Sequence, residues 1–457
     1  MQYVQRKITF RLYPSPAETA LLEHTLGLHC RVYNTLKEAH EQRHTEGAPR
    51  LTFNAMCRTL TEWRAAVPAL SAVNAQSLQV TAKRLSRAFD AFFRRVAAGE
   101  TPGYPRFKSY RRYPGWGYKT YGDGWKLKGA YDAHGFRYQR LALTGIGDLT
   151  IRGQGRFAGT PKTCEILHKA GKWYASVTFD VAPHQIQRPQ GRDAAAFDWG
   201  LKTLLSIAKA DGSLQEIDNP RWLKRRIEAI KTLQRAISAE ETRLRTVHGL
   251  AAEQRLPHDK QNARLRAHYA QLRAVHGKVA RQRKDFYHKL TTWLVETFQF
   301  LGTEALAVKN MVKRPKAKRD ADTGEHLPNG ASAKAGLNRS ILDAAPSMLL
   351  TMLTYKAEEA ACEYREAPTK QVKPTQRCHQ CGALVQKSLA DREHRCACGC
   401  VCGRDANAAK TVLRWLLEGD FWAASPQGAT PGTGEAAGGF RLRKPETPPI
   451  ADALAAV

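Results

Sequence analysis

Six of the ten cysteines lie in one short stretch of the sequence, from Cys378 to Cys402. Closely spaced thiolates are preferred ligands of structural Zn²⁺ sites. The pattern Cys378-x-x-Cys381-Gly predicts a metal-binding knuckle, in which the glycine leaves room for backbone N–H groups to approach the thiolates. The alternative is that these cysteines are reduced and bind no metal.

The second knuckle is irregular, because cysteines at 396, 398, 400 and 402 cannot form a Cys-x-x-Cys pair. We choose Cys398 first and Cys396 second as its ligands, with Cys400 as the substitute, whereas His379 and His394 rank lower. Four thiolates leave no open coordination position on the ion. The stretch therefore predicts a zinc ribbon that holds a structural Zn²⁺.

Three acidic residues have unusual local contexts. Asp198 lies inside an apolar strand, "AAAFDWG", where an unpaired charge is costly. Glu304 ends another short strand, "FQFLGTE", and Asp405 opens the helix "RDANAAKTVLRWLL". Taken singly, each has an ordinary interpretation: a turn at a strand end for Asp198 and Glu304, and for Asp405 an acid favoured by the helix dipole.

The order of these acids favours a joint role. An acid in a strand, an acid at a strand end and an acid at a helix start would converge at one edge of an RNase H-like α/β fold. Three clustered carboxylates cannot remain ionised together without cations. We therefore expect Asp198, Glu304 and Asp405 to hold two Mg²⁺ ions about 4 Å apart, an arrangement that cleaves phosphodiesters. The sequence contains no G-x-S-x-G, H-E-x-x-H or P-loop motif that would indicate another chemistry.

The composition indicates a polyanionic partner. The formal net charge is +30, from 72 Lys and Arg against 42 Asp and Glu, which favours binding to nucleic acid. An anionic membrane is the alternative, but no basic segment adjoins an apolar anchor. The N-terminal segment "MQYVQRKITFRLYP" alternates as a strand does rather than resembling a signal peptide. We expect a soluble, cytoplasmic protein.

The first half of the chain predicts a small β-rich unit around a helical insertion. Residues 4–13 alternate as a strand, and "SPAE" predicts a capped helix start. A helical block follows over 53–97. Residues 103–128 interleave Lys and Arg with Tyr and Trp. This mixture is equally compatible with a nucleic-acid contact and with a basic surface loop whose aromatic residues are buried. Two later strands predict a hairpin around Ala170 and Gly171.

From Gly191 the pattern changes to buried strands followed by long basic helices. "DAAAFDWGLKTLLSIAKADGSL" predicts two strands, and helices are expected over 221–249 and 260–298. Their Arg- and Lys-rich faces indicate either a solvated surface or a nucleic-acid groove, and we favour the groove because of the net charge. A polar loop over 313–337 and a helix over 338–364 are expected next, and the tail is too poor in bulky residues to fold.

The quoted segments resemble a known family. "FDWGLKTLLSIA", "LGTEALAVKNM" and "GRDANAAK" resemble the three RuvC motifs of the TnpB proteins of insertion sequences, which are relatives of compact type V CRISPR effectors. "GYPRFKSYRR", "KDFYHKLTTWLV" and "CHQCG" also resemble TnpB segments in the same order, so the similarity extends over about residues 3–416.

This resemblance implies an RNA-guided DNA endonuclease that uses a guide RNA from the end of its own element and recognises a short motif beside the target in double-stranded DNA. By motif, Asp198, Glu304 and Asp405 take the catalytic positions. The zinc positions fall on Cys378, Cys381, Cys396 and Cys398. A monomer on the RNA is expected, with a dimer as the alternative.

The implied fold is multidomain α+β. It combines an N-terminal β-barrel-like unit that has a helical insertion with an RNase H-like (RuvC) nuclease that has a zinc-ribbon insertion. The expected limits are 1–48 and 120–190 for the β-barrel-like wedge unit, 49–119 for the helical lobe and basic aromatic linker, 191–373 and 403–420 for the nuclease, 374–402 for the zinc ribbon and 421–457 for a disordered tail. A basic channel between the lobes would hold the guide–target heteroduplex by its backbone.

Two departures from the family pattern lie beside Asp405. Gly403 stands where relatives commonly have an acid, and the second knuckle is one residue short. Both could displace Asp405, so an RNA-guided DNA-binding protein that does not cut efficiently is the alternative function. Because all three acids are present, we favour cleavage. A DNA-strand transposase is a weaker interpretation, since no tyrosine or DDE arrangement is placed for it.

Overall fold

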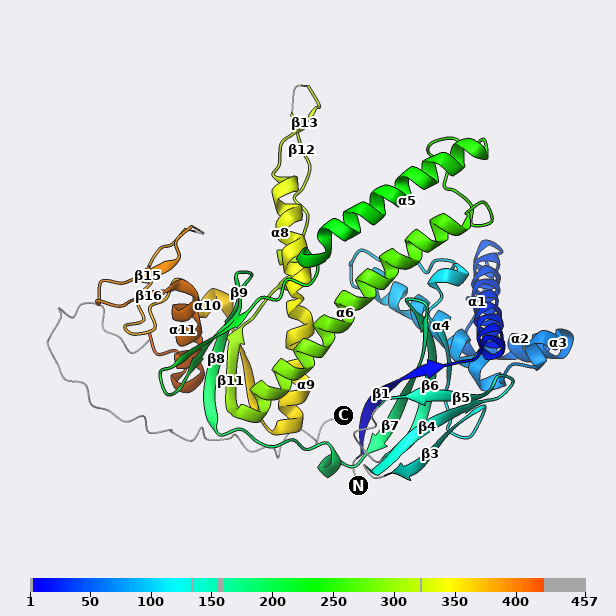
Figure 1. Ribbon diagram of the computed structural model, residues 1–457, viewed down its shortest axis with the longest axis horizontal. Coiled ribbons are helices and arrows are strands. Elements are labelled where there is room, and N and C mark those ends of the chain that lie inside the picture. Colours follow the sequence, from blue (N-terminus) through cyan, green and yellow to red (C-terminus); the bar gives the residue numbers. More distant parts are fainter. Residues whose placement is uncertain (1–2, 133–134, 154–158, 321–322, 389, 423–457) are drawn as a thin grey trace. The chain divides into compact units, whose positions relative to one another are not determined.

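The chain folds as two units, residues 1–187 and residues 188–457 (Figure 1). The computed structural model describes residues 3–132, 135–153, 159–320, 323–388 and 390–422. None of the helices in these ranges is long and apolar enough to span a membrane.

The first unit is built on a seven-stranded antiparallel sheet with the strand order β2-β6-β7-β1-β5-β4-β3. Its strands are β1 (Val4–Tyr13), β2 (Gly115–Tyr118), β3 (Trp125–Asp132), β4 (Gly135–Leu143), β5 (Gly147–Arg152), β6 (Thr160–Lys169) and β7 (Lys172–Val181). β1 lies at the centre, and its buried Ile8, Phe10 and Leu12 confirm the predicted alternation. The predicted hairpin is β6–β7, whose turn residues Ala170 and Gly171 both have positive φ.

Helices α1 (Pro16–Thr45), α2 (Phe53–Ala66), α3 (Pro68–Ser71) and α4 (Ala75–Ala97) complete this unit, and one continuous core joins them to the sheet. The Ser15 hydroxyl accepts from the Glu18 N–H while the Glu18 carboxylate accepts from the Ser15 N–H, so the predicted capping box is confirmed. The predicted helical block over 53–97 is confirmed, but it is divided into three helices. The chain breaks at Pro68, which cannot donate a helical hydrogen bond, and α4 restarts at Asn74, whose side chain caps the new helix.

The basic aromatic segment divides into two parts. Tyr104, Phe107 and Tyr110 are 44–54% exposed, whereas Trp116 and Tyr118 on β2 are buried in the core. The interpretation with buried aromatic residues is confirmed for the second part only, and nucleic-acid contact stays a prediction for the first part. The first part keeps aromatic faces and cations at the surface, and the second part is a structural strand.

The second unit contains a five-stranded sheet with the order β10-β9-β8-β11-β14. Its strands are β8 (Asp193–Trp199), β9 (Thr203–Lys209), β10 (Leu214–Asp218), β11 (Phe298–Glu304) and β14 (Glu363–Ala367). β8, β9 and β10 form an antiparallel meander, while β11 pairs parallel with both β8 and β14. The carboxyl ends of β8 and β11 therefore lie at the same edge of the sheet.

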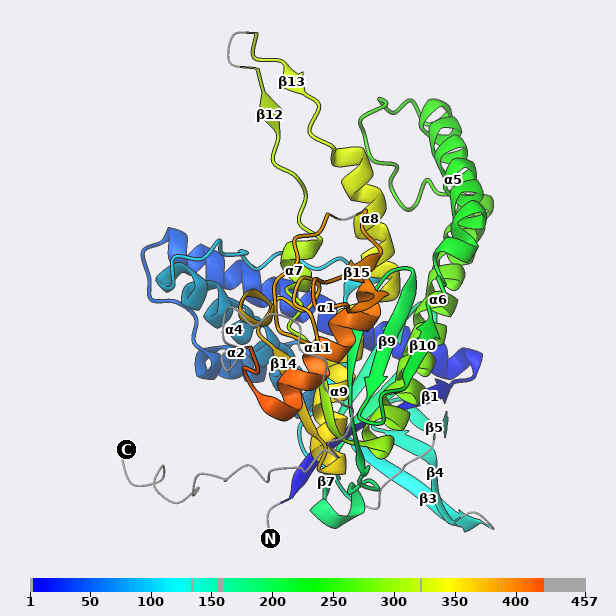
Figure 2. The same ribbon diagram turned by 90° about the vertical axis from the view of Figure 1, so that its left-hand side faces the viewer.

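Helices cover both faces of this sheet (Figures 1 and 2). Ala195, Phe197 and Leu301 pack with α6 (Ala263–Thr297) and α9 (Pro346–Ala360). On the opposite face, Ala194 and Ala196 pack with α11 (Arg404–Glu418). β8 is thus buried on both sides, which explains why its sequence is a continuous apolar run around Asp198.

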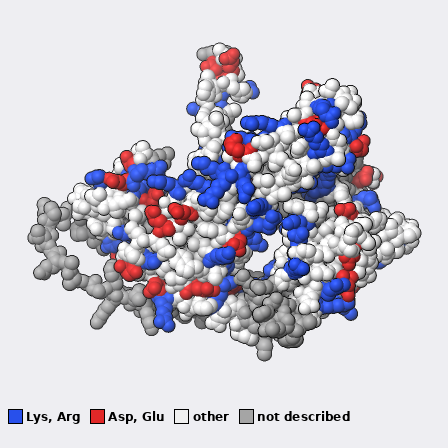
Figure 3. Space-filling view, viewed as in Figure 1, with Lys and Arg blue, Asp and Glu red and all other residues white. Residues whose placement is uncertain are grey.

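Helices α5 (Ile227–Val247) and α6 extend from this sheet as a pair with a small core of their own. Figure 3 shows Lys and Arg side chains gathered over α5 and over the short helix Lys224–Arg226 that precedes it. The polar segment 313–337 is not only a loop, because it includes a small hairpin, β12 (Lys318–Arg319) and β13 (His326–Leu327), and the start of α8 (Ala331–Ala344). The single helix predicted over 338–364 was wrong: Pro346 starts α9 after Ala345 adopts positive φ.

The cysteine-rich segment lies between β14 and α11 and contains the strands β15 (Glu393–Arg395) and β16 (Val401–Gly403). β16 leads directly into α11. Of the predicted disordered tail, 421–457, only Phe421 and Trp422 are described, and the remainder lies outside the described residues.

Candidate functional site

Asp198 and Glu304 lie on the same face of two neighbouring strands. Thr303 of β11 is paired with Phe197 of β8, and the Thr303 hydroxyl donates to the Phe197 carbonyl over 3.1 Å. The next residues along these parallel strands are Asp198 and Glu304. Because side chains alternate, Asp198 points to the same face as Ala196, which packs against α11. Glu304 points to that face too, in phase with Gly302.

Asp405 reaches this edge from the first turn of α11. α11 lies close to the sheet because the residues between them are small. A Cβ atom on Gly302 would lie 3.2 Å from Val412 Cγ1 and 3.3 Å from both Ala196 Cβ and Leu416 Cδ2. The absence of a side chain at Gly302 therefore sets how closely α11, and with it Asp405, approaches the other two acids.

The charges of the three acids act on one another. Burial raises the pKa of Asp198 well above its usual value, the negative charges of Asp405 and Glu304 raise it further, and Arg404 opposes this shift. Burial also raises the pKa of Glu304, against a smaller lowering by the Thr369 hydroxyl. Arg404 Nε lies 3.3 Å from Asp405 Oδ1, so one cation already neutralises part of the cluster.

Buried carboxylates that raise one another's pKa in this way would be stabilised in their ionised form by a cation. Carboxylate oxygens are the preferred ligands of Mg²⁺, and an opposite charge would favour the ionised form of Asp198. The residues present thus fit divalent cations. The sequence prediction selected the three acids, but it missed Gly302 and Arg404. The small-residue pattern of "FLGTE" and the Arg beside Asp405 were the available signals.

The cysteine segment brings four thiols into one cluster. The Sγ atoms of Cys378, Cys381, Cys396 and Cys398 all lie within 4.8 Å of one another. The distance is 3.7 Å between Cys378 Sγ and Cys398 Sγ and 3.5 Å between Cys381 Sγ and Cys396 Sγ. Four Zn–S bonds of about 2.3 Å in tetrahedral geometry require S–S separations of about 3.8 Å. The cluster fits Zn²⁺ in size and in chemistry.

The turns of the two knuckles explain why Cys396 can replace the usual first cysteine of the second pair. In the first knuckle the Gly382 N–H donates to the Cys378 carbonyl over 3.0 Å. In the shorter second knuckle the Gly399 N–H donates to the Cys396 carbonyl, also over 3.0 Å. Gly382 and Gly399 both have positive φ, which lets each turn close in a conformation that favours glycine.

Buried side chains connect the first knuckle to α11. Asn407 Nδ2 donates to the carbonyls of Arg377 and Pro374 over 2.7 and 3.2 Å. The Thr411 hydroxyl also donates to the Arg377 carbonyl, over 3.0 Å. Asn407 and Thr411 are fully buried and were not selected from the sequence. Their position one helical turn apart, on the apolar side of α11, was the available signal.

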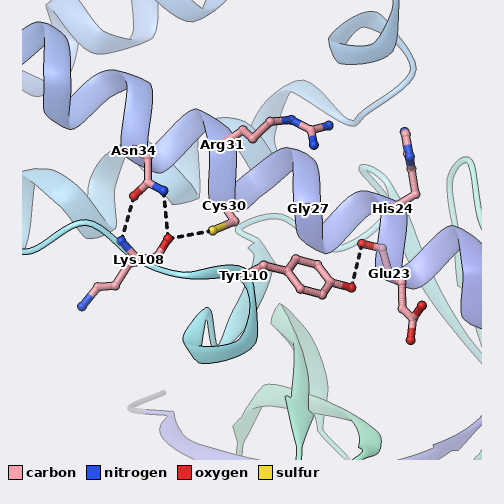
Figure 4. Close-up of a pocket in the computed structure, with 8 residues that line it drawn as sticks. All are labelled: Glu23, His24, Gly27, Cys30, Arg31, Asn34, Lys108 and Tyr110. Carbon is pink, nitrogen blue, oxygen red and sulfur yellow. Dashed lines mark hydrogen bonds between the residues drawn. The ribbon is translucent and has the colours of Figure 1, made fainter. Parts of the chain in front are cut away.

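Two cavities lie elsewhere in the described residues. One, of about 430 Å³, lies in the first unit along α1, where Asn34 Nδ2 donates to the Lys108 carbonyl and Asn34 Oδ1 accepts from the Lys108 N–H (Figure 4). Tyr110 lies beside it with its hydroxyl toward the Glu23 carbonyl. The other, of about 460 Å³, begins two residues after Glu304 and is lined by residues 306–310 and by Leu350 and Thr351 of α9, among others.

Comparison with known proteins gives relatives that span nearly the whole chain. A family model described as "Probable transposase" (OrfB_IS605) matches residues 176–315, and one described as "Cas12f1-like, TNB domain" matches residues 347–412. A "Putative RNA-guided DNA endonuclease" of Streptomyces pristinaespiralis is 27% identical over 426 residues, which cover 90% of each chain. The predicted resemblance to the TnpB family is confirmed. The "Putative RNA-guided DNA endonuclease InsQ" of Escherichia coli strain K12 is 25% identical over 88% of this chain and 90% of its own.

A solved structure is similar in fold. The protein in the "Cryo-EM structure of the Cas12f1-sgRNA-target DNA complex" aligns with a TM-score of 0.50 and 11% identity, over 90% of this chain and 98% of its own. The chain thus has a mixed α/β, multidomain, Cas12-like fold with a TNB domain over its C-terminal part.

Proposed function

We propose that this chain is an RNA-guided, metal-dependent DNA endonuclease that cuts target DNA beside a short flanking motif. The observation that carries the proposal is the alignment of Asp198 and Glu304 on one sheet face, with Asp405 on the helix that packs there. The strand order β10-β9-β8-β11-β14, with β11 and β14 parallel to β8, supports an RNase H-like (RuvC) nuclease over residues 191–373 and 403–420. The names of the relatives support the same activity.

Asp198, Glu304 and Asp405 would hold the divalent ions. Bound there, two Mg²⁺ ions would stabilise the attacking and leaving oxygens of the phosphodiester. The chain's own residues prepare this site. Both other acids act on Asp198, so its ionised form would gain from a cation, while Arg404 holds the carboxylate of Asp405 at the helix start. The Thr369 hydroxyl donates to the Ala305 carbonyl and so fixes the turn that follows Glu304.

Guide RNA and double-stranded target DNA are the proposed partners. The RNA would select the target by base pairing, and the protein would contact the backbones through its basic surfaces. In the second unit, the Lys- and Arg-rich surface over α5 is one candidate (Figure 3). In the first unit, the cavity beside Arg31, Lys108 and Tyr110 combines cations with an exposed aromatic face, as contacts with unpaired bases require. If phosphate neutralisation dominates, affinity falls steeply with salt; a flat salt response would contradict these contacts.

For the remaining domains we keep the limits expected from the sequence, except that β2 belongs to the seven-stranded sheet and not to the helical lobe. Residues 374–402 would form a zinc ribbon around Cys378, Cys381, Cys396 and Cys398, where a structural Zn²⁺ would position α11. Residues 1–48 and 120–190 would form the wedge unit and 49–119 the helical lobe, which together would contact the flanking motif. A monomer on its RNA suffices for this arrangement.

The deciding experiment is plasmid cleavage by the full chain co-expressed with its flanking RNA, using a randomised motif beside the target. Reactions contain Mg²⁺ or EDTA, with Asp198→Ala as the inactive control. We expect guide-dependent cutting at one motif, only with Mg²⁺. Guide-dependent binding without cutting would reject the nuclease in favour of an RNA-guided binder, the outcome expected if Gly403 displaces Asp405.

A further inference from the structure

The four-cysteine cluster leaves two cysteines of the segment unused. Cys400 and Cys402 are not among its four thiols, yet both lie in a second group of potential ligands with His379. In this group Cys400 Sγ lies 3.8 Å from His379 Nδ1. Cys400 is 4% exposed, and the donor atoms of the three residues lie within 4.8 Å of one another.

The register of β15 and β16 explains why these side chains meet. Cys402 is the direct cross-strand partner of His394. Since side chains alternate along a strand, Cys400 lies on the same face as Cys402, while the intervening Val401 is 59% exposed on the other face. One face of this small ribbon therefore presents Cys400, Cys402 and His394 toward the first knuckle, which carries His379.

His394 is an independent indication of a ligand site. Its side chain is fully buried, and its Nε2 atom has no hydrogen-bond partner. His394 also forms a group within 4.8 Å with Cys378 and Cys400, so Cys400 is common to both groups. A buried ring nitrogen without a partner is rare in folded proteins, and a metal ion would supply its partner.

We propose that the chain binds a second Zn²⁺ ion, held by Cys400, Cys402 and His379, whose donor atoms already lie together, with His394, which groups with Cys400 but not with all three, turning toward the ion as the fourth ligand. Two thiolates and two imidazoles are a usual tetrahedral set for structural Zn²⁺. The second site adjoins the four-cysteine site at Cys378, and the segment is thus a two-metal module. This proposal is independent of the nuclease activity.

The surroundings of both histidines suit this role. Metal-bound histidines usually donate their other ring N–H to a fixed acceptor. Asn407 Oδ1 lies 3.0 Å from His379 Nδ1 and is such an acceptor, which would leave Nε2 of His379 as the atom that binds the ion. Lys387 Nζ lies 2.6 Å from His394 Nδ1 and also donates to the Thr375 carbonyl over 2.8 Å. Because the Lys387 ammonium donates to His394 Nδ1, the ring proton lies on Nε2; on metal binding this proton would move to Nδ1, and Lys387 would keep only the bond to Thr375.

The second ion would fix the residues that lead to the third acid. Cys402 belongs to β16, which ends at Gly403, and α11 starts at Arg404. With Cys402 anchored, only Gly403 and Arg404 separate a metal ligand from Asp405. Relatives commonly have an acid at the position of Gly403. In this chain, the second ion would instead hold this part of the backbone in place.

The test is the metal content of the full chain purified with its RNA. Native mass spectrometry and elemental analysis count the Zn²⁺ ions, and substitution with Co²⁺ reports tetrahedral thiolate ligation by absorbance. We expect two ions in the wild type and one in Cys400→Ser/Cys402→Ser. The thiolate-to-Co²⁺ band should fall by about a third in this variant, because four of six thiolates remain. Cys57→Ser, which lies outside the segment, is the matched control and should keep both ions.

Each other outcome overturns the proposal. One ion in both the wild type and the double variant would mean that Cys400 and Cys402 bind no metal. One ion in the wild type that is lost in Cys400→Ser would assign Cys400 to the first site as a substitute for Cys396. A wild type with one ion and a mass lower by two hydrogens would indicate a disulfide between Cys400 and Cys402. The wild-type count needs no variant, so a misfolded variant does not prevent the test.

Discussion

Asn407 accepts a hydrogen bond through Oδ1 from the backbone N–H of His379 over 3.2 Å, which ties the helix of the third acid to the first cysteine knuckle. Asn407 lies two residues after Asp405, and its amide also donates to the Pro374 and Arg377 carbonyls. This one buried side chain thus provides hydrogen-bond partners for three backbone groups: the Pro374 and Arg377 carbonyls and the His379 N–H. The folding of the cysteine segment and the position of Asp405 are coupled through this residue.

Replacing Asn407 by alanine should weaken this coupling. The change leaves buried backbone groups without partners, which costs about 1–3 kcal/mol for each group that water cannot reach. We expect a lower melting temperature and slower cleavage, with guide RNA binding retained. Lys410→Ala, on the same helix, is the control and should be nearly neutral in both assays. Equal stability of the Asn407→Ala and Lys410→Ala variants would show that the link carries no stabilisation.

The Asp198→Asn substitution should abolish cleavage and at the same time stabilise the metal-free protein. It removes a charge that burial, Asp405 and Glu304 all disfavour. In EDTA we expect a higher melting temperature, by about 2–4 °C for each kcal/mol gained in a unit of this size. Asp193→Asn, at the exposed start of the same strand, is the matched control and should change neither property. An unchanged or lower melting temperature for Asp198→Asn would mean that this carboxylate is not under electrostatic strain.

The stability of the metal-free protein should fall as pH rises above the usual range of a carboxylate pKa. Because the pKa of Asp198 is raised in the folded state, the folded chain holds more protons than the unfolded chain between the two pKa values. The free energy of unfolding therefore decreases with increasing pH in that interval, and the raised pKa of Glu304 acts in the same direction. Thermal melts in EDTA across this interval measure the effect.

Mg²⁺ should reverse this trend, because the ion binds the ionised acids and competes with their protons. The rise in melting temperature on adding Mg²⁺ should grow with pH in the wild type and be small in Asp198→Asn. A Mg²⁺ effect that is independent of pH, or equal in the two proteins, would exclude binding at these acids.

The sequence allowed the acids to be found partly from local context and partly from their order. An Asp in a continuous apolar strand is unusual, whereas an acid in the first turn of a helix is common, so Asp405 was selected because it follows the two strand acids. Their common location depends on the pairing of β8 with β11, in which the Thr303 hydroxyl and the Phe197 carbonyl are 106 residues apart. Local patterns do not encode such pairing. It was anticipated from the order of the motifs and their resemblance to a family.

The second knuckle shows where spacing rules reach their limit. A pattern of four alternating cysteines leaves the choice between Cys396 and Cys400 open, since both could face the first knuckle. The structure groups Cys396 with the four-thiol cluster and Cys400 with His379, because the turn at Gly399 separates the two. Pro68 and Pro346 were available in the sequence as indications of helix breaks. The breaks were overlooked because apolar residues recur at helical spacing on both sides of each proline.

Gly302 gives the sharpest test of how packing positions the third acid. It is a point of close approach between β11 and α11, and a Cβ there would press on Val412, Ala196 and Leu416 at 3.2–3.3 Å. Gly302→Val should therefore push α11 outward, at a cost of about 1–3 kcal/mol for overpacking. Because Asp405 moves with α11, cleavage should fall further than stability alone explains, while RNA binding remains.

Gly336→Ala is the matched control for this change. Gly336 lies in α8, and no neighbouring atom lies within 4 Å of the position that a Cβ would take there, so alanine should stabilise the helix by about 0.5–1 kcal/mol. Gly302→Ala should displace α11 less than Gly302→Val does, since the neighbours of an alanine side chain need to shift by only a few tenths of an ångström. Cleavage rates at saturating Mg²⁺ and guide should decrease in the order glycine, alanine, valine. If Gly302→Val cuts at the wild-type rate, the approach of α11 does not determine the position of Asp405.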